Sequence, residues 1–319
     1  MFKYLTGVKP SGNFHLGNFI STILPIMNEG IQDETLFLIA DYHALTNPSH
    51  LSKISEDRWN IAKILYSFGI KNILFQSSIP QIFELNWILS NFTPKGLLNR
   101  AHGYKAQVDI NNSRGKPVDY GINTGLFNYP VLMTSDLTIF STDYVFVGED
   151  QKQHIEIAKD IIDNFNRLNY QLKVPDPIFK SDKLVLGTDG RKMSKSYKNE
   201  IPVMTSKKKL KKYIFSLPTN EKNVGESKGF DESHVCELFK SFASQSDVRG
   251  LKEQMVNGIG WGEVKQTVFD EILEWFEHPW EVYYNIDSQD LKRYVNSTTE
   301  KARGIAENVL LNVRSSMNV

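Results

Sequence analysis

Short apolar runs alternate with helical apolar stripes over the first half of the chain, and this pattern predicts an α/β fold. Residues 4–8 indicate a short buried strand, and residues 34–40 (ETLFLIA) form a continuous apolar run, as in strands buried on both faces. Two further strands are predicted at residues 72–76 and 142–147. Helical spacing is found at residues 16–27, 52–68, 125–140 and 155–168. This alternation favours a doubly wound, parallel (Rossmann-type) sheet.

The alternation of strands and helices breaks between residues 79 and 126. Helices are predicted at 83–92 and 97–107, and the polar stretch at 109–123 (DINNSRGKPVDYGIN) indicates a loop. We interpret this region as a helical insertion between two halves of the sheet. It is a candidate subunit interface or lid.

From residue 201 the pattern is almost wholly helical. Helices are predicted at residues 233–244, 248–256, 263–277, 288–296 and 299–314, with Gly258, Gly260, Gly262 and Pro279 at the junctions. A chain of 319 residues is long enough for two domains. We therefore expect a Rossmann-type domain at 1–200 and an all-α domain at 201–319.

Composition narrows the class of protein. The 37 basic and 37 acidic residues cancel, which argues against binding nucleic acid by overall charge but allows a local basic patch. Five lysines at 207–212 are typical of a solvated helix face, and they are also a candidate contact for a phosphate backbone. The single cysteine, Cys236, excludes an intramolecular disulfide and predicts a buried apolar position. No stretch approaches the roughly 20 apolar residues of a membrane span, so we expect a cytoplasmic protein without membrane contact.

Two loops carry candidate phosphate chemistry. The strand at 4–8 runs through a glycine-bearing loop containing His15 into a helix, an arrangement that points helix N–H groups at an anion. His15 is either structural or a contact to phosphate or ribose. The stretch GTDGRKMSKSYKN places Lys192 and Lys195 in a loop opened by two glycines, which suits a mobile clamp for polyphosphate and would otherwise be a solvated basic turn.

Acidic groups at two further places suggest a ligand site. Asp136 lies in the apolar helical run at 125–140, where a carboxylate is costly unless it is paired or used. It either faces water or a backbone group, or accepts a hydrogen bond from an otherwise apolar ligand. The sequence GEDQ at 148–151 follows a predicted strand, as does DYHALT at 41–46, and open α/β sheets place ligands at such strand ends.

These motifs together resemble a known family. The sequence GVKPSGNFHLGN resembles the first nucleotide-binding signature of class I aminoacyl-tRNA synthetases, and KMSKS matches the second. The sequences ADYHALT, GLFNYPVLMTSD and VGEDQKQHIE are similar to the tryptophanyl branch, with the tyrosyl branch as its nearest relative. The resemblance extends from near the start of the chain through its C-terminal helices.

The resemblance implies roles for individual residues. ATP would be bound by Lys9, Pro10, Ser11, His15, Gly17, Asn18, Gly148, Glu149, Asp150, Val185, Lys192, Met193, Ser194, Lys195 and Ser196. Among these, His15, Lys192 and Lys195 would be catalytic, because they would stabilise the reacting phosphates. Tryptophan would be bound by His43, Tyr129, Met133, Asp136, Val145 and Gln151, with Asp136 accepting from the indole N–H. The insertion has basic residues, Arg100 and Lys105, where the family also has them.

The resemblance also implies an activity. ATP and Mg²⁺ would activate L-tryptophan as its adenylate, the aminoacyl group would pass to tRNA, and the protein would be a homodimer whose helical domain reads the anticodon. No protein metal site is expected, since Mg²⁺ would be held through the ATP phosphates. A tyrosyl enzyme, a non-catalytic RNA-binding or regulatory paralogue and another nucleotidyltransferase are the alternatives. Phe146, where the family usually has proline, and Thr134-Ser135 depart from the pattern and could tune the shape of the pocket.

Overall fold

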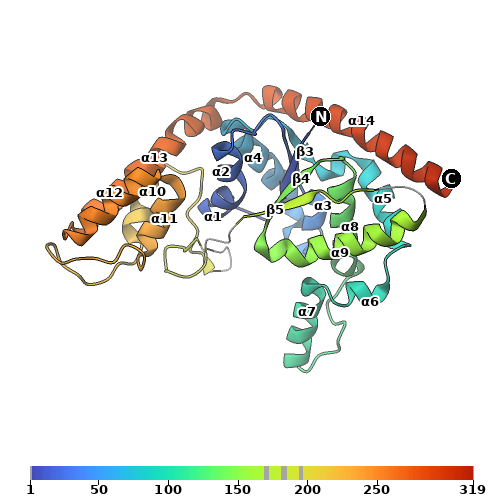
Figure 1. Ribbon diagram of the computed structural model, residues 1–319, viewed down its shortest axis with the longest axis horizontal. Helices are drawn as coiled ribbons and strands as arrows, with labels where there is room; N and C mark the ends of the chain where they lie inside the picture. Colours follow the sequence, from blue (N-terminus) through green and yellow to red (C-terminus); the bar gives the residue numbers. More distant parts are fainter. Residues whose placement is uncertain (1, 169–171, 181–184, 194–196, 319) are drawn as a thin grey trace. The chain divides into compact units, whose positions relative to one another are not determined.

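The computed structural model describes residues 2–168, 172–180, 185–193 and 197–318, and its internal contacts divide the chain into two units (Figure 1). Unit 1 consists of Met1–Ser11, Ile26–Asp182 and Asp287–Val319, and unit 2 of Gly12–Pro25 and Lys183–Ile286. We expected a single boundary near residue 201, but the segments near both ends of the chain are assigned differently. Unit 2 includes a segment from the N-terminal region, and unit 1 includes the last helix.

Unit 1 is built on a parallel sheet whose strand order is β3-β2-β1-β4-β5. Its strands are β1 Tyr4–Val8, β2 Thr35–Ile39, β3 Ile73–Phe75, β4 Tyr144–Gly148 and β5 Asp176–Lys180. Every residue of β2 and β3 is buried, which explains their continuous apolar sequences. The first strand lies in the middle with later strands added on both sides, so the predicted doubly wound, Rossmann-type sheet is confirmed.

Strand β5 was not predicted from the sequence. Its sequence DPIFK is short and contains a proline, and both features weaken the strand signal. It lies at the edge of the sheet and pairs only with β4 among the described strands. An edge position tolerates proline because one side of the strand forms no ladder.

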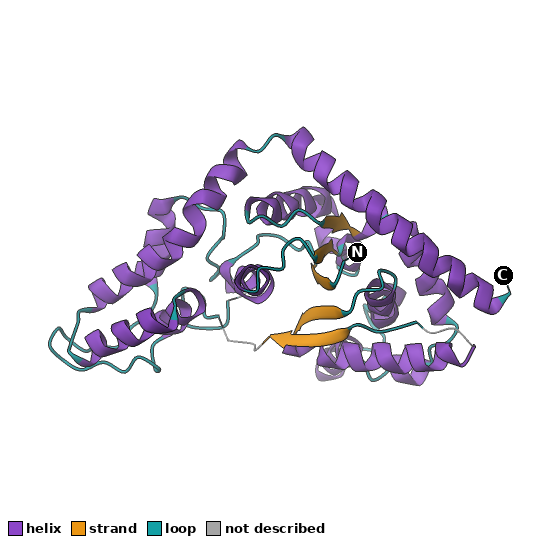
Figure 2. Cartoon of the chain, turned by 45° about the horizontal axis from the view of Figure 1, so that its top comes forward, coloured by secondary structure: helices purple, strands orange, loops and turns teal. Residues whose placement is uncertain are grey.

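Helices cover the sheet of unit 1, as Figure 2 shows for the strands and helices of this unit. They are α3 Asp41–Ala44, α4 Ile54–Ser67, α5 Pro80–Ser90, α8 Thr124–Thr138, α9 Lys152–Phe165 and α14 Ser288–Met317. Short 3₁₀ turns occur at Pro48–Lys53, Gln76–Ser78, Glu149–Gln151 and Asn166–Leu168. Helix α8 packs between α5 and α9, so a polar side chain on its inner face is surrounded by the core.

The insertion has two helices in place of the single helix predicted at residues 97–107. Helix α6 spans Lys95–Leu98 and α7 spans His102–Ser113, so the expectation of one helix at 97–107 is wrong. Helix α7 also includes part of the stretch expected to be a loop, and it projects from the rest of unit 1 (Figure 1). Buried Asn111 explains the difference, because its Nδ2 donates to Val118 O and Tyr120 O at 2.8 and 2.9 Å and ties the following turn to the helix.

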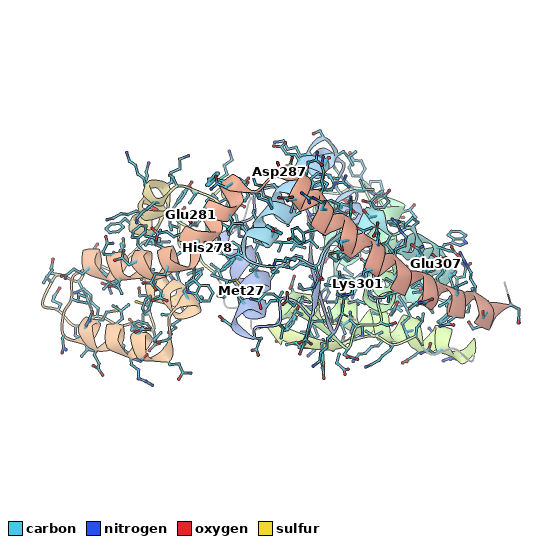
Figure 3. All side chains as sticks on the ribbon, turned by 90° about the horizontal axis from the view of Figure 1, so that it is seen from above. Met27, His278, Glu281, Asp287, Lys301 and Glu307 are labelled. Carbon is cyan, nitrogen blue, oxygen red and sulfur yellow. The ribbon has the colours of Figure 1, made fainter. Side chains whose placement is uncertain are left out.

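Helix α14 is one continuous helix of 30 residues, whereas the sequence predicted two helices separated near Asn296. Its small and branched residues Ala302, Ala306, Val309 and Leu310 are buried in the hydrophobic core of unit 1. Figure 3 looks onto this helix, with Lys301 and Glu307 labelled along it. Burial of this stripe explains why the helix belongs with the sheet.

Unit 2 is helical. It contains α1 Leu16–Asn18, the π-helical turn Phe19–Ile23, the start of α2 Leu24–Asn28, α10 Lys207–Ser216, α11 His234–Phe242, α12 Gln245–Val256 and α13 Trp261–Asn285. The ring of Phe19 contacts Phe242 and Phe276 with centroids 6.0 and 5.0 Å apart, which anchors the N-terminal segment in this unit. Helix α13 continues through Pro279, so the predicted end near residue 277 is wrong.

None of the helices in the described part of the chain is long and apolar enough to cross a membrane.

Two adjacent leucines of α14 test its place in the core. Leu310 is 1% exposed and Leu311 is 49% exposed. We expect Leu310→Ala to lower the free energy of unfolding by about 2–5 kcal/mol, because it leaves a cavity in unit 1. Leu311→Ala should change the free energy of unfolding by no more than about 0.5 kcal/mol. Denaturant unfolding measures both, and equal effects would contradict the assignment of α14 to this core.

Candidate active site

Asp136 is buried in unit 1, and its carboxylate makes three hydrogen bonds with protein groups. It is 5% exposed on the inner face of α8. His43 Nε2 lies 2.8 Å from Asp136 Oδ2, and Gln76 Nε2 donates to Oδ1 and Oδ2 at 2.8 and 2.9 Å. The three side chains come from α8, from α3 after strand β2, and from the turn directly after β3. Of the possibilities left open by the sequence, exposure of Asp136 to water is therefore excluded.

Burial and hydrogen bonding act on Asp136 in opposite directions. Desolvation raises the pKa of its carboxyl group, whereas the bonds from His43 and Gln76 lower it, and the net shift is upward. His43 Nδ1 is buried without a hydrogen-bond partner among the described residues. A buried polar atom without a partner is unusual in a native protein, so this cluster is a candidate ligand site.

Tyr129 connects this cluster to a second histidine. Its ring makes edge contacts with His43 and His154, with centroids 4.8 and 5.0 Å apart. Burial raises the pKa of Tyr129 to about 12, so the hydroxyl stays protonated and can both donate and accept at neutral pH. His154 was missed in the sequence, although it lies three residues after Gln151 of the GEDQ motif, because a single histidine on a helix is more often structural.

The orientation of Gln151 is fixed by its neighbours. Its Nε2 donates to Asp150 Oδ2 at 2.8 Å, which turns its Oε1 toward His154 Nδ1, 3.1 Å away. Burial lowers the pKa of His154, so its ring is neutral at pH 7. Because an amide oxygen only accepts, Nδ1 carries the proton and Nε2 is left as an acceptor, without a partner among the described residues. The side-chain amide of Gln151 is thus hydrogen-bonded to Asp150 and His154, and Nε2 of His154 is left as an acceptor.

Two other residues expected to bind tryptophan, Val145 and Met133, have apolar surroundings. Val145 is 2% exposed on β4 and belongs to the hydrophobic core of unit 1, against which Met133 packs from α8. Thr134 and Ser135 donate to the carbonyl groups of Pro130 and Val131 in their own helix at 2.8 and 3.1 Å. Their hydroxyls are therefore satisfied within α8 and add no polar group that needs a ligand.

Several residues expected to bind ATP lie at the ends of strands in unit 1. Lys9, Pro10 and Ser11 directly follow β1, and of these Lys9 is exposed and Pro10 buried. Gly148 ends β4, and Glu149 and Asp150 form the exposed turn after it. Both groups thus occupy carboxyl ends of neighbouring strands, where open α/β sheets bind ligands.

In unit 2, His15 caps the first helix. Its Nδ1 accepts from the backbone N–H of Asn18 at 3.3 Å, and the Asn18 side chain accepts from the His15 N–H at 3.2 Å. His15 is 8% exposed, and its Nε2 lies 3.8 Å from Glu200. Gly17 leaves room for the His15 ring, because a Cβ would lie only 3.0 Å from it. The structure fixes the ring of His15 with one nitrogen used in the cap.

Within unit 2, residues 14–17 of the first signature lie beside residues 201–203 and beside Met193 of the second signature. Leu16 N donates to Ile201 O at 2.9 Å, and Val203 N donates to Phe14 O at 3.1 Å. Met193 of the second signature is 5% exposed, and a Cβ on Gly17 would lie 3.8 Å from its sulfur. Segments far apart in the sequence are thus joined by backbone hydrogen bonds.

The base of the lysine loop, residues 185–193 and 197–199, is held by a compact network. Met193 N donates to Val185 O at 2.8 Å, and Asn199 Nδ2 donates to Asp189 Oδ1 at 2.6 Å and to Lys192 O at 3.1 Å. The bond from Asn199, together with Arg191, lowers the pKa of Asp189 to about 2. Val185 is half-buried and Lys192 is exposed. Ser194, Lys195 and Ser196 lie outside the described residues.

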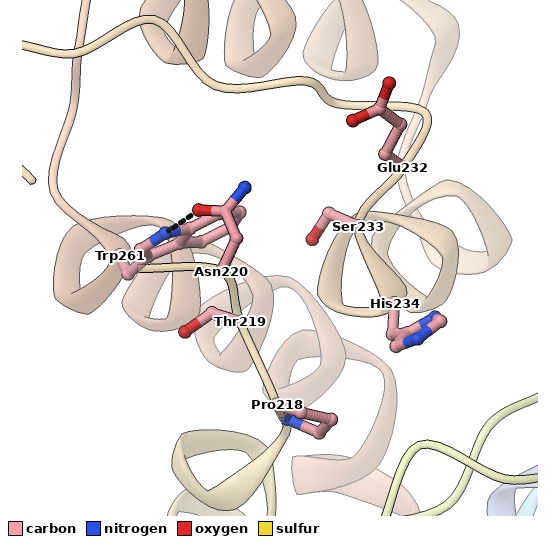
Figure 4. Close-up of a pocket in the computed structure, with 7 residues that line it drawn as sticks. All are labelled: Pro218, Thr219, Asn220, Glu232, Ser233, His234 and Trp261. Carbon is pink, nitrogen blue, oxygen red and sulfur yellow. Dashed lines mark hydrogen bonds between the residues drawn. The ribbon is translucent and has the colours of Figure 1, made fainter. Parts of the chain in front are cut away.

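Unit 2 also has a surface pocket that the sequence did not indicate. It is lined by Pro218, Thr219, Asn220, Glu232, Ser233, His234 and Trp261 (Figure 4). Trp261 Nε1 donates to Asn220 Oδ1 at 3.0 Å, whereas the buried hydroxyl of Ser233 has no partner among the described residues. A Cβ on Gly190 would lie 3.3 Å from Pro218, so this pocket adjoins the base of the lysine loop.

No group of three or more His, Cys, Asp or Glu side chains suited to a metal ion occurs within the described ranges.

Comparisons with known proteins identify the relatives of this chain. The family model described as tRNA synthetases class I (W and Y) matches residues 1–277. The Tryptophan--tRNA ligase of Neisseria meningitidis serogroup A is 36% identical over 328 residues, which cover 99% of this chain and 98% of the relative. The Tryptophan--tRNA ligase of Pseudomonas putida is 37% identical over 330 residues, which cover 99% of this chain and 74% of the relative.

Solved structures agree in fold. The Tryptophanyl-tRNA Synthetase from Campylobacter jejuni complexed with ADP and Tryptophane superposes with a TM-score of 0.82 and 33% identity, covering 99% of both chains. The Tyrosyl-tRNA Synthetase from Archaeoglobus fulgidus gives a TM-score of 0.66 at 18% identity, which shows a shared fold alone.

Gly187 gives a direct test of the loop base. A Cβ there would lie 2.4 Å from the side chain and carbonyl of Asn199, so Gly187→Ala must displace Asn199 and break its bond to Asp189. We expect the affinity for ATP to fall about tenfold, equivalent to about 1.4 kcal/mol. Calorimetric titration with ATP measures this change.

Gly250→Ala is the matched control, because a Cβ in this position of α12 meets nothing within 4 Å. It should leave ATP affinity unchanged and stabilise the protein slightly. Unchanged ATP affinity in Gly187→Ala would show that the order of the loop base is not needed for nucleotide binding.

Proposed function

Because the chain belongs to the class I tRNA synthetases of the tryptophan and tyrosine group, we infer that it is a tryptophan–tRNA ligase. It activates L-tryptophan with ATP and transfers the aminoacyl group to tRNA. The single observation that carries this inference is the identity to tryptophan–tRNA ligases over nearly the full length of both chains. The segment around His15 and the base of the lysine loop in unit 2, together with the Asp136 cluster in unit 1, support this proposal.

The first step needs positioning and charge stabilisation and no general base. The tryptophan carboxylate, already ionised at neutral pH, attacks the α-phosphorus of ATP, and the bond to pyrophosphate breaks as the acyl–phosphate bond forms. In our proposal, Lys192 and Lys195 stabilise the negative charge on the leaving pyrophosphate. Mg²⁺ bound to the ATP phosphates would supply further charge neutralisation. In the second step a terminal hydroxyl of tRNA attacks the acyl carbon, and AMP leaves.

The Asp136 cluster accounts for the choice of tryptophan. We propose that Asp136 accepts the indole N–H, with Tyr129 and His154 near the amino-acid end of the substrate. Phenylalanine has no ring donor, so its binding would leave a buried acceptor without a partner. Such a loss can favour the correct substrate by about 10⁴–10⁵-fold. A tyrosine hydroxyl could also donate to Asp136, which makes the tyrosyl enzyme the specific alternative.

Unit 2 supports the proposed contact with tRNA. Lys208, Lys209 and Lys212 are exposed on α10, which fits contacts with phosphates. The pocket around Trp261 lies in the same unit and offers an aromatic ring and hydrogen-bonding groups of the kind that bind unpaired bases. We therefore propose that the helical part of unit 2 binds the anticodon arm.

The insertion is the proposed dimer interface. It exposes Ile110, Val118 and Tyr120 to 41, 48 and 54% of their surface, and exposed apolar side chains close together in sequence are typical of a surface that binds a partner. We propose a homodimer that works in the cytoplasm, where charged tRNA is used.

ATP–pyrophosphate exchange with each of the twenty amino acids and Mg²⁺ tests the activity. We expect exchange with tryptophan alone. Asp136→Asn should raise the KM for tryptophan about 10- to 100-fold, because its amide would place a donor against Gln76 or His43. Exchange with tyrosine instead would assign the tyrosyl activity, and no exchange by folded protein would favour a non-catalytic paralogue.

Exposed lysines of α10 test the tRNA contact. We expect Lys208→Ala with Lys212→Ala to lower kcat/KM for tRNA aminoacylation about tenfold and to reduce its salt dependence, because two phosphate contacts are lost. Amino-acid activation should be unchanged. Lys159→Ala with Lys292→Ala removes the same charge from exposed positions in unit 1 and serves as the control. Equal losses in the two double variants would indicate a general charge effect.

A further inference from the structure

Gln76 is a fully buried polar residue to which the sequence assigned no role. It is 0% exposed, directly after strand β3. Every hydrogen-bonding atom of its side chain is used. Its Nε2 donates to both oxygens of Asp136 at 2.8 and 2.9 Å, and its Oε1 accepts from the backbone N–H groups of Tyr42 and His43 at 3.0 and 3.3 Å.

The backbone fixes which way this amide faces. The N–H groups of Tyr42 and His43 can only donate, so the oxygen of Gln76 must face them and the NH₂ group must face Asp136. The amide therefore connects the first turn of α3 to the carboxylate on α8 in one orientation. This contact ties two helices together at the carboxyl end of the sheet.

A second network holds the backbone next to Gln76. Asp41 is 2% exposed, accepts from Ser77 N at 2.9 Å and pairs with Arg58 at 2.9 Å. The Arg58 guanidinium also lies 4.8 Å from the ring centre of Phe75, the last residue of β3. The chain on both sides of Gln76 is thus fixed, and its side chain has little freedom to move away from Asp136.

These contacts distribute the acceptor capacity of Asp136 unevenly. Oδ2 takes two hydrogen bonds, from His43 and Gln76, whereas Oδ1 takes one from Gln76. A carboxylate oxygen accepts about two hydrogen bonds, so Oδ1 keeps one position open. Both partners donate to the carboxylate and favour its ionised, acceptor-only form against the effect of burial.

We propose that Gln76 is the positioning residue that holds Asp136 with Oδ1 available to a ring N–H, and that it thereby determines selectivity for an N–H-bearing side chain. The inference rests on the proposed tryptophan activation. Gln76 itself does not touch the substrate in this proposal. A purely structural role would instead affect all amino-acid substrates and overall stability alike.

The test compares two ligands that differ at one atom. ATP–pyrophosphate exchange is measured with tryptophan and with 3-(1-benzothiophen-3-yl)alanine, in which sulfur replaces the ring N–H. Gln76→Met keeps the length of the side chain and removes all four hydrogen bonds. We expect the KM for tryptophan to rise about tenfold or more, with kcat and the KM for ATP within about twofold of the parent enzyme. The KM for the sulfur analogue should hardly change.

The expected signature is therefore a fall of about tenfold in the ratio of kcat/KM for tryptophan to kcat/KM for the sulfur analogue. Gln81→Met is the matched control, because Gln81 makes its hydrogen bond to Glu307 on the surface of the same unit, at 2.7 Å. This control should leave the ratio unchanged. Gln76→Glu, which keeps the shape and an oxygen facing α3, should also lower the ratio, and it takes the place of Gln76→Met if that variant does not fold.

An unchanged ratio in folded Gln76 variants, from an enzyme whose parent activates tryptophan, would overturn the role of Gln76 and leave the proposed function intact. Equal losses for both ligands would likewise overturn it in favour of a structural role. Absence of tryptophan exchange in the parent enzyme would overturn both proposals together.

Discussion

The buried carboxylate of Asp136 is the constraint on which the arrangement of unit 1 depends. Removing an ionised carboxylate from water costs several kcal/mol unless hydrogen bonds replace its hydration. The donors come from His43 and Gln76, so α3, the end of β3 and α8 must meet at one point. That meeting point lies at the carboxyl end of the parallel sheet. The fold thus places its most costly polar group where a ligand can use it.

In unit 2 the main structural cost is the ordering of loops that carry the residues expected to bind phosphate. Glycine-rich loops lose much conformational entropy when they are fixed, and backbone hydrogen bonds between Phe14–Leu16 and Ile201–Val203 offset part of that loss. The same pairing brings His15 and the base of the lysine loop into one unit. The two units thus contain two separate hydrogen-bond networks, one around a buried acid and one between paired loops.

Prediction from sequence succeeded where a signal is local. The all-buried strands β2 and β3 are continuous apolar runs, and the signatures around His15 and Lys192 are short, specific motifs. It failed where burial by distant residues decides the outcome. Strand β5 forms because β4 offers it a partner, and α14 is one helix because its alanine stripe packs in the core of unit 1. Neither partner can be seen within the segment itself.

The sequence by itself determined the fold class and the family, and it predicted which residues carry the chemistry, because these are inferred from local periodicity and fixed spacing. Only the tertiary structure decided how those residues are used. Whether Asp136 faces water, which way the amides of Gln76 and Gln151 point, and which nitrogen of His154 is left as an acceptor all depend on neighbours from other elements. Hydrogen bonding in a buried site is set by groups that converge in space, and that convergence is not encoded in any one stretch of the chain.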